Sequence, residues 1–519
     1  MAESPSTPHP AAEDRWSSLR WSVVILILSL ATLLVHGYHP LAEDGGLYVA
    51  GIEFTLNPSL FPHFTQFVSE HPHFSVFAPV VAAIIQIAHV PLLDALLILH
   101  LLTIALTIAA ARAVLRRVTP NERAQLAGIA TLAAICTVPI AGTSLLLMDP
   151  YLTARSLSTP LSLWAIAFAL DGWKNNLRSL TGCILLIGLS AAFHPLMAGY
   201  ALGLIVVLRA LQSRRTTLLV PLALLTFAAA AILQARAPAE SAAVVLAAKS
   251  RYYWFLSQWH WYELFGLAGP ILVLLALRHR NHFGFGPTGS MLSNAAILYG
   301  CFASVITFVF AHQSYQAHIV ARLQPLRAFQ IVYIVMFLLL GASVQQFFER
   351  SSRSPRLARF AICPILLAAA LTMLVAQRTE FPFSAHVELP WRFQQSVNPW
   401  VRAFLWCRDN TPQNALFALD AHYITTPGED AQTFRAIAQR SVLPDFSKDG
   451  GEAAITPRLA EEWDSGFTAQ LNLDQQTTPQ LRAHLAPFGV DWVILRADSP
   501  ATLICPYEND MLKVCKLQP

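Results

Sequence analysis

Apolar runs of nearly the length that a helix needs to cross a bilayer recur along the first three quarters of this chain. That length is about 20 residues. Twelve runs approach or reach it: 21–38, 74–90, 92–115, 124–147, 156–171, 177–193, 195–211, 217–235, 262–278, 290–311, 325–347 and 360–376. Only 13% of the 519 residues are charged, whereas soluble domains hold about a quarter. We therefore expect a mainly α protein with a polytopic transmembrane domain of about 11 to 13 segments.

Basic residues in the short connections predict which helix ends face the cytoplasm, because Lys and Arg are enriched on that side. They cluster at 112–123, 174–178, 209–215, 278–280 and 350–359, and Arg15 and Arg20 precede the first run. If all of these face inward, the outward segments are 39–73, 149–155, 194–195, 236–261, 312–324 and everything after 377. One conflict remains. Residue 39 is expected outside and the cluster at 112–123 inside, which requires an odd number of crossings between them, but two runs, 74–90 and 92–115, lie there.

The composition changes after residue 377, and no spanning run follows. Short apolar or alternating stretches predict strands at 415–419, 490–495 and 511–517, and helices at 433–439 and 478–485. We expect three parts: a polar, disordered cytoplasmic N-terminus (1–20), a transmembrane domain (21–377) and a small extracytoplasmic α/β domain (378–519). A disulfide between Cys505 and Cys515 is compatible with a periplasmic location of the last part.

Two adjacent carboxylates, Glu43 and Asp44, follow directly on the first apolar run. Acids at a membrane edge are costly to keep unless they have a function. Gly45 and Gly46, which come next, allow the backbone to turn sharply and a ligand to come close. A solvated turn that simply ends a helix is the alternative interpretation, and the position of the acids alone does not separate the two.

A second outward turn carries Asp149 and Arg155. An arginine on the outer side runs against the inward bias of basic residues, so we expect an anionic partner, either Asp149 or a ligand phosphate. His194 lies before Pro195, where it marks a break between two helices or reaches the same outer cavity; both interpretations stay open.

Two further arginines, Arg322 and Arg327, flank the start of an outer helix, where they would bind phosphate through charge-assisted hydrogen bonds. In the C-terminal part, a charged cluster between residues 435 and 448 is expected to form a solvated or salt-bridged face. The histidines of segment 39–73 match no zinc spacing.

The layout resembles the GT-C superfamily of membrane glycosyltransferases, which have many spans, a catalytic acid in the first outward loop and often a C-terminal periplasmic domain. Glu43-Asp44 stands at the acidic position of that family. The tail Phe488-Gly489-Val490-Asp491-Trp492-Val493-Ile494-Leu495, followed by Tyr507-Glu508-Asn509, is similar to the ends of bacterial members and of uncharacterised multispanning relatives. A WWD motif of the oligosaccharyltransferase type is absent from the sequence, which argues against that branch.

The resemblance implies transfer of a sugar from a polyprenyl-phosphate donor to an envelope acceptor at the outer face of the bacterial inner membrane. Asp44 would act as general base, and Glu43 would orient the acceptor or tune Asp44. Arginines would hold the leaving phosphate, and a divalent cation at Asp44 and Asp149 would suit carboxylate ligands. The candidates for substrate binding are Tyr48, Asp149, Arg155, His194, Arg322 and Arg327.

Two other functions stay open. A transporter or lipid flippase would use the same charges as a substrate path, although transporter sites tend to lie near the membrane midplane rather than at its edge. A scaffold for envelope assembly would bind a partner through the C-terminal domain. No nucleic-acid partner is expected, because the basic residues are spread among short loops instead of forming one patch.

Overall fold

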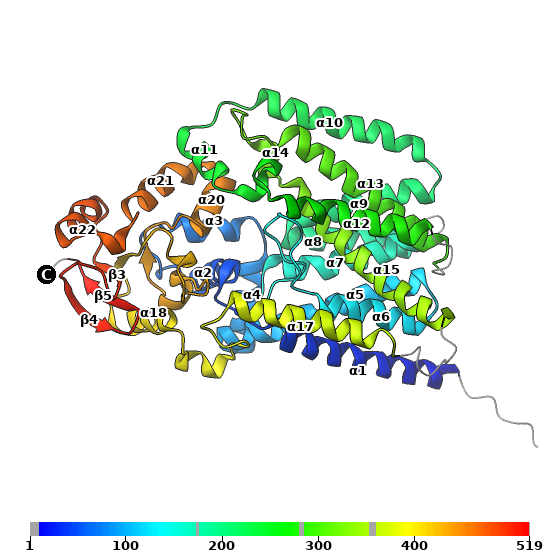
Figure 1. Ribbon diagram of the computed structural model, residues 1–519, viewed down its shortest axis with the longest axis horizontal. Helices are drawn as coiled ribbons and strands as arrows, with labels where there is room; N and C mark the ends of the chain where they lie inside the picture. The colour runs from blue at the N-terminus through cyan, green and yellow to red at the C-terminus, as the bar shows by residue number, and fades with distance from the viewer. Residues whose placement is uncertain (1–9, 173–175, 280–284, 352–359, 518–519) are drawn as a thin grey trace, which may run out of the picture.

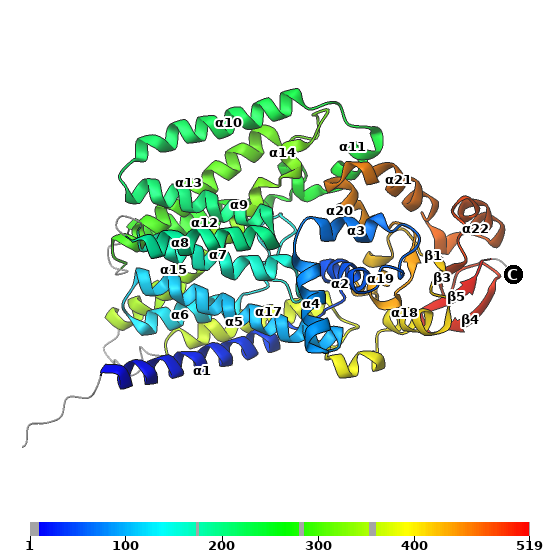
Figure 2. The same cartoon turned by 180° about the vertical axis from the view of Figure 1, so that it is seen from behind.

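The computed structural model describes residues 10–172, 176–279, 285–351 and 360–517. A bundle of roughly parallel and antiparallel helices forms one part, and a smaller part with a sheet packs against one end of it (Figures 1 and 2). The helices of the bundle are α1 (Pro10–His36), α5 (Leu92–Val118), α6 (Glu122–Ala134), α7 (Ala154–Leu170), α8 (Leu177–Phe193), α9 (Pro195–Gln212), α10 (Leu219–Arg236), α12 (Trp261–His279), α13 (Pro287–Phe310), α15 (Phe329–Ser351) and α17 (Cys363–Glu380).

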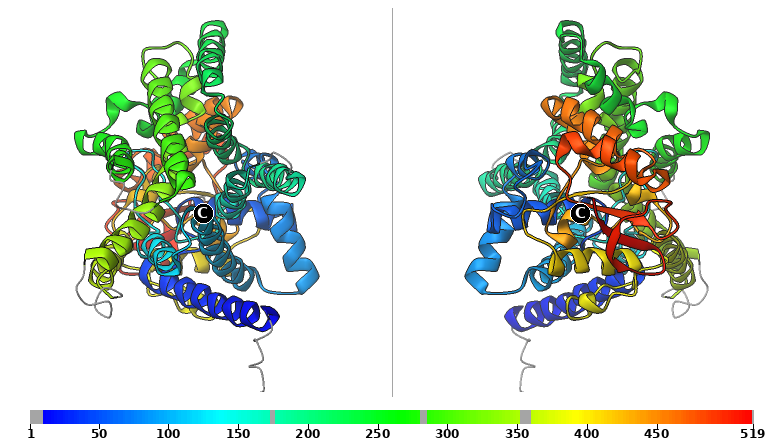
Figure 3. Two further views of the ribbon diagram at one scale, coloured as in Figure 1. Left: turned by 90° about the vertical axis from the view of Figure 1, so that its right-hand side faces the viewer. Right: turned by 90° about the vertical axis from the view of Figure 1, so that its left-hand side faces the viewer.

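Seven helices within the described ranges are long and apolar enough to cross a membrane. They are α1, α5, α9, α10 with the short η1 (Thr216–Leu218) before it, α12, α13, and α15 together with α14 (Ile319–Arg322). The chain is therefore a multi-pass membrane protein, as its composition predicts. Figure 3 shows the bundle end-on, with α1 and α10 at opposite edges.

The expected run 74–90 becomes α4 (Phe77–Ala88), a helix of 12 residues. At 1.5 Å per residue it is roughly 18 Å long, too short for the ~30 Å hydrocarbon layer. Between segment 39–73 and the basic cluster at 112–123, α5 is then the one described helix long enough to cross, which gives the odd number of crossings that the expected orientation needs. The basic residues Lys174, Arg280, Arg353, Arg356 and Arg359 lie outside the described residues.

Helix α1 begins at Pro10, inside the segment 1–20 that was predicted to be disordered. Proline at the first helical position has its φ preset for a helix and lacks an N–H that would go unpaired there. Residues 1–9 lie outside the described residues.

The predicted run 124–147 is helical only as far as Ala134, after which the chain folds back as a buried hairpin. Met148 N–H donates to the Cys136 carbonyl (2.7 Å), and Leu147 N–H donates to the Val138 carbonyl (3.0 Å). The turn occurs after Pro139, which cannot continue a helix because it lacks an N–H. Non-helical backbone is tolerated at membrane depth where protein surrounds it and its polar groups are paired.

The C-terminal part contains a five-stranded sheet in the order β2-β1-β3-β5-β4. β1 pairs in parallel with β2 and β3, whereas β5 is antiparallel to β3 and β4. A disulfide joins Cys505 in β4 to Cys515 in β5. The strands are β1 (Leu416–Ala418), β2 (Ser441–Val442), β3 (Trp492–Arg496), β4 (Ile504–Glu508) and β5 (Leu512–Lys516), and the helices around them are α18 (Pro399–Asn410), α19 (Phe434–Ala438), α20 (Lys448–Ile455), α21 (Ala460–Ala469) and α22 (Thr478–Leu485). The predicted small α/β region is confirmed.

The outward segment 39–73 forms two helices, α2 (Glu43–Leu56) and α3 (Gln66–His73). The structure therefore differs from the expected sharp turn at Gly45 and Gly46, because both lie in the first turns of α2. A Cβ on Gly46 would lie 1.3 Å from the Thr433 side-chain oxygen, and one on Gly45 would lie 3.0 Å from the Tyr151 Cβ. The glycines thus let α2 approach its neighbours closely.

Residues 37–43, which we call the connecting segment, lead from α1 to α2 and pair with the C-terminal part. Tyr38 forms a parallel bridge with Val387, and Ala42 forms an antiparallel bridge with Gln432. On its other side, His39 N–H donates to the Pro150 carbonyl (2.8 Å). The segment is therefore held between the C-terminal part and the turn that carries Asp149.

Candidate functional site

The two acids Glu43 and Asp44 form the first turn of α2. Negative charge is favoured there by the dipole of the helix. Glu43 has φ +52°, and it donates its N–H to the carbonyl of Ala431 (2.7 Å), which itself has φ +54°. Left-handed backbone in residues other than glycine costs of order 1–3 kcal/mol each and persists only where the surroundings impose it. The position of the acids is thus strongly determined.

Lys448, the first residue of α20, reaches both acids. Its ammonium donates to the Glu43 carboxylate and lies 3.1 Å from Asp44 Oδ1. The side chains of Asp44 and Glu43 are 45% and 34% accessible, and that of Lys448 is 12% accessible. The Asp44 carboxylate is therefore partly exposed to solvent beside an ammonium that is mostly covered.

The opposite charges around Asp44 and Lys448 stabilise the ionised form of each group. Burial acts to raise the pKa of Asp44, but the ammonium of Lys448 and the guanidinium of Arg155 outweigh it and hold that pKa below its usual range. Burial lowers the pKa of Lys448, and the two acids more than reverse this effect. Asp44 and Lys448 are therefore both charged at neutral pH.

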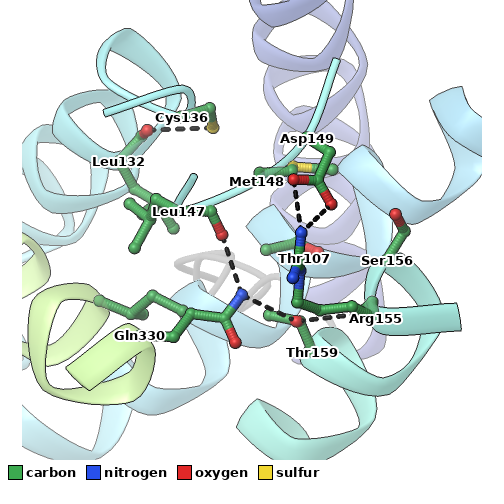
Figure 4. Close-up of a pocket in the computed structure, with 11 residues that line it drawn as sticks. Thr107, Leu132, Cys136, Leu147, Met148, Asp149, Arg155, Ser156, Thr159 and Gln330 are labelled. Carbon is green, nitrogen blue, oxygen red and sulfur yellow. Dashed lines mark hydrogen bonds and ion pairs between the residues drawn. The ribbon is translucent and has the colours of Figure 1, made fainter. Parts of the chain in front are cut away.

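A second ion pair, Asp149 with Arg155, lies close by in the turn between α6 and α7 (Figure 4). Arg155 Nη2 donates to Asp149 Oδ1 at 2.6 Å, and the side chains are only 3% and 8% accessible. Burial raises the pKa of Asp149 although Arg155 opposes it. Thr153 caps α7 through a reciprocal capping box with Ser156, which fixes the turn that holds the pair.

Two small cavities flank Asp149. One, of about 20 Å³, is also lined by Thr107 and Gln330 (Figure 4), and the other, of about 10 Å³, by His36 and His100. A water needs about 10–15 Å³, so these cavities hold about one water each. The accessible carboxylates of the region are those of Asp44 and Glu43, whereas that of Asp149 is buried.

The turn that carries Asp149 touches the first turn of α2, because Tyr151 packs against Gly45. Arg155 and Arg327 both act electrostatically on Asp44. Tyr48, one helical turn beyond Asp44, lies within the electrostatic reach of the same charges and packs edge-on against Phe77, with ring centroids 5.0 Å apart. The structure thus places six predicted site residues in one region: Glu43, Asp44, Tyr48, Asp149, Arg155 and Arg327.

Arg327 differs from the other cations of the region. It lies in η5 (Pro325–Ala328), its Nε is buried without a hydrogen-bond partner, and the described residues supply it with no ion pair. Its guanidinium carbon is 5.9 Å from the centre of the Tyr253 ring. Arg327 is therefore a cation placed near Asp44 without an acid of its own.

Arg322 and His194 have other roles in the structure. Arg322 forms an ion pair with Glu240 (2.7 Å) and donates to the Ala454 carbonyl (2.8 Å), so it links the bundle to α20. His194 caps α9, where its Nδ1 accepts from the Met197 N–H (3.4 Å). Neither side chain is brought to Asp44 by these contacts.

Lys448 and Glu429 belong to this region but were not among the candidates. Glu429 is fully buried and neither of its carboxylate oxygens has a hydrogen-bond partner. Burial, followed by the nearby charge of Glu43, raises its pKa well above the usual value. Lys448 belongs to the charged cluster that the sequence predicted to be a solvated or salt-bridged face. Glu429 gave no signal, because it lies 386 positions after Glu43 in a stretch that looks like ordinary polar surface.

The donors present do not fit the divalent cation expected at Asp44 and Asp149. Each of these carboxylates already has its own cation, Lys448 in one case and Arg155 in the other. Across the described ranges, no group of three or more His, Cys, Asp or Glu side chains is arranged to hold a metal ion.

No protein family and no curated protein matches the sequence. Among solved structures, the chain is similar to the archaeal oligosaccharyltransferase AglB from Archaeoglobus fulgidus, in complex with an inhibitory peptide and a dolichol-phosphate. That match has a TM-score of 0.44 and 12% identity over 93% of this chain and 70% of that one. The arabinofuranosyltransferase AftD from Mycobacteria matches with a TM-score of 0.46 and 16% identity, over 92% of this chain and 35% of that one. At such low TM-scores neither likeness assigns a function to this chain.

Proposed function

We propose that this protein is a glycosyltransferase of the GT-C type, which moves a sugar from a polyprenyl-phosphate donor to an acceptor hydroxyl outside the cytoplasm. The observation that carries the proposal is the partly accessible carboxylate of Asp44 where the bundle meets the C-terminal part, in the electrostatic field of Arg327, a cation for which the described residues supply no ion pair. Transfer from a lipid phosphate needs a proton acceptor for the nucleophile and a cation for the leaving phosphate.

In this mechanism, Asp44 accepts the proton of the acceptor hydroxyl while the hydroxyl oxygen attacks the anomeric carbon of the donor. The bond between that carbon and the phosphate oxygen breaks, and its electron pair remains on the phosphate. Arg327 stabilises the charge that develops there. Arg155 contributes its field but stays paired with Asp149.

Lys448 controls how basic Asp44 is. A carboxylate held ionised by an ammonium is a weak base, whereas a general base works best with a pKa near the operating pH. Lys448 contacts Glu43 as well as Asp44, so its ammonium has a second partner when the acceptor approaches Asp44. Glu43 thereby tunes Asp44 by holding Lys448.

Two observations support an outer-face location for this chemistry. The acid pair lies at the end of the bundle that the C-terminal part covers (Figure 1). That part contains the Cys505–Cys515 disulfide, and disulfides persist in oxidising compartments such as the bacterial periplasm. Reactivity of single cysteines introduced into residues 380–500 toward a membrane-impermeant thiol reagent tests this; protection in intact cells would contradict it.

The experiment that tests the function is sugar transfer by the purified protein in liposomes, with a panel of radiolabelled polyprenyl-phosphate sugars. Asp44→Asn should abolish transfer while the protein remains folded. Asp94→Asn is the matched control, since Asp94 starts α5 at the same end of the bundle and has no hydrogen bond within the described residues. Equal transfer by wild type and Asp44→Asn would remove Asp44 from the base role.

The two arginines offer a second comparison. Arg327→Met should lower transfer and raise the donor concentration needed for half-maximal rate, because it removes the cation for the leaving phosphate. Arg322→Met should lower stability, through the lost pair with Glu240, and leave transfer per folded molecule unchanged. Lipid movement across the bilayer without sugar transfer by any donor would favour a flippase over an enzyme.

A further inference from the structure

Another cavity, which we call the groove, lies between α1 and the start of α6. The two helices run side by side there, at the end of the bundle far from the sheet (Figure 2). The volume of the groove is about 570 Å³, within the range of roughly 300–1,000 Å³ usual for small-molecule sites. Its lining comes from both helices: Arg20, Trp21, Val24, Asn121, Arg123 and Leu126, with Glu122 between them.

Two guanidinium groups, those of Arg20 and Arg123, line this groove, and a third, that of Arg112, lies behind its wall at Trp21. Arg20 and Arg123 are 63% and 51% accessible at its edge. Arg112 lies over the ring of buried Trp21, 3.8 Å from its centre, and its Nε has no hydrogen-bond partner. Arg116 also acts electrostatically on Arg112.

Two acids only partly offset these cations. Glu122 pairs with Arg20 (2.5 Å), and Glu349 pairs with Arg123 (3.4 Å). Arg112 and Arg116 do not line the groove, but they lie next to it on α5 and have no such partner within the described residues, so its surroundings hold four guanidinium groups against two carboxylates. The groove therefore has an excess of positive charge and attracts an anion.

The walls of the groove continue as apolar surface along the bundle. Val24 and Leu126 lie next to the arginines, and on α1 the neighbouring Val23, Leu26 and Ile27 are 47%, 58% and 58% exposed. The apolar window of α1 begins at Ser18, so Arg20 and Trp21 lie at the depth of lipid head groups, where Arg and Trp are commonly found. A ligand seated here has an anionic head and an apolar tail.

We propose that the groove between α1 and α6 binds an anionic phospholipid, with its phosphodiester on Arg20 and Arg123, in the field of Arg112, and an acyl chain along α1. A zwitterionic head group is disfavoured because its own cation is repelled by the excess positive charge. Basic residues near a membrane surface contribute about 1 kcal/mol each to the binding of anionic lipid. Removing two of them should therefore weaken binding at least tenfold.

The test is native mass spectrometry of the purified full chain with phosphatidylglycerol, phosphatidylcholine or inorganic phosphate. We expect retained phosphatidylglycerol, at least tenfold tighter than phosphatidylcholine, and no retained inorganic phosphate. The double variant Arg20→Gln, Arg123→Gln should lose this preference. If breaking the Arg20–Glu122 pair prevents folding, the single variant Arg123→Gln should still weaken phosphatidylglycerol binding severalfold.

The matched control is Arg214→Gln with Arg215→Gln, which removes the same charge from two exposed residues at the same end of the bundle. This control should bind phosphatidylglycerol like wild type. Equal binding of the two lipids, equal loss in both double variants, or retention of inorganic phosphate in place of lipid would each overturn the proposal.

Discussion

Replacing Gly46 by alanine should separate α2 from the C-terminal part. The added Cβ would lie 1.3 Å from Thr433 Oγ1, 2.5 Å from Thr433 Cβ and 2.7 Å from the Leu41 carbonyl oxygen. Rotation of the Thr433 side chain relieves only the first contact, and it breaks the hydrogen bond from Thr433 Oγ1 to the same carbonyl. The two backbones must therefore move apart.

The expected cost follows from three contributions. Overpacking a close contact costs about 1–3 kcal/mol and a lost hydrogen bond about 1 kcal/mol, whereas alanine in a helix gains about 0.5–1 kcal/mol over glycine. The net destabilisation is about 1–3 kcal/mol. Gly199→Ala in α9 is the control, because nothing lies within 4 Å of its added Cβ, and it should be neutral or slightly stabilising.

The assay is thermal unfolding of both variants in the same detergent at one scan rate, since membrane proteins often unfold irreversibly. The double variant Gly46→Ala, Thr433→Gly should recover part of the loss, because neighbouring substitutions are coupled. An unfolding midpoint of Gly46→Ala equal to that of Gly199→Ala would refute the argument that close packing requires this glycine.

Three further predictions follow from charges in the same region. Lys448→Met should raise the pKa of Asp44 by about 1–2 pH units, because a cation about 3 Å away at an effective dielectric of roughly 40–80 contributes ~1–3 kcal/mol. Mass spectrometry of carbodiimide labelling, which requires a protonated carboxyl, checks this; labelling at an unchanged pH would contradict it. Asp149→Asn should cost about 3–5 kcal/mol, because it leaves buried Arg155 unpaired. Adding Arg155→Met should restore part of the unfolding midpoint, and no restoration would argue against the pair. Burial raises the pKa of Glu53 from 4.5 to about 8, so the native state keeps a proton that the unfolded chain releases. Stability should therefore fall as pH rises from about 4.5 to 8, and Glu53→Gln should flatten this slope; identical slopes would exclude Glu53 as the cause.

The sequence predicted those parts of the fold whose residues repeat with a regular period. Strands β1, β3 and β5 and helices α19 and α22 all appear where apolar or alternating stretches predicted them. Strand β2 has two residues, too few for a pattern. Strand β4 contains Pro506, which argues against a strand locally and is tolerated because β4 is at the edge of the sheet.

The candidate site was only partly predictable. The acid pair stood out because it follows an apolar run, but two glycines disfavour a helix, so α2 was not expected to begin there. Packing against Thr433 overrides that local preference. Lys448 was assigned to a solvated or salt-bridged cluster and not to the site, because its contact with Asp44 spans 404 positions and no local pattern encodes such a contact.

The sequence separation between Asp44 and Lys448 also determines when the site can form during synthesis of the chain. At about 5–20 residues per second, ribosomes add Lys448 roughly 20–80 seconds after Asp44. For most of this delay the connecting segment lacks its bridge partners Val387 and Gln432, which have not yet been synthesised. During all of it, the acids at the start of α2 lack the ammonium of Lys448. A nascent chain whose synthesis stops before residue 448 therefore leaves inserted helices with an unfinished anionic cleft. The centre is completed only as the C-terminal part folds back onto helices that were inserted much earlier.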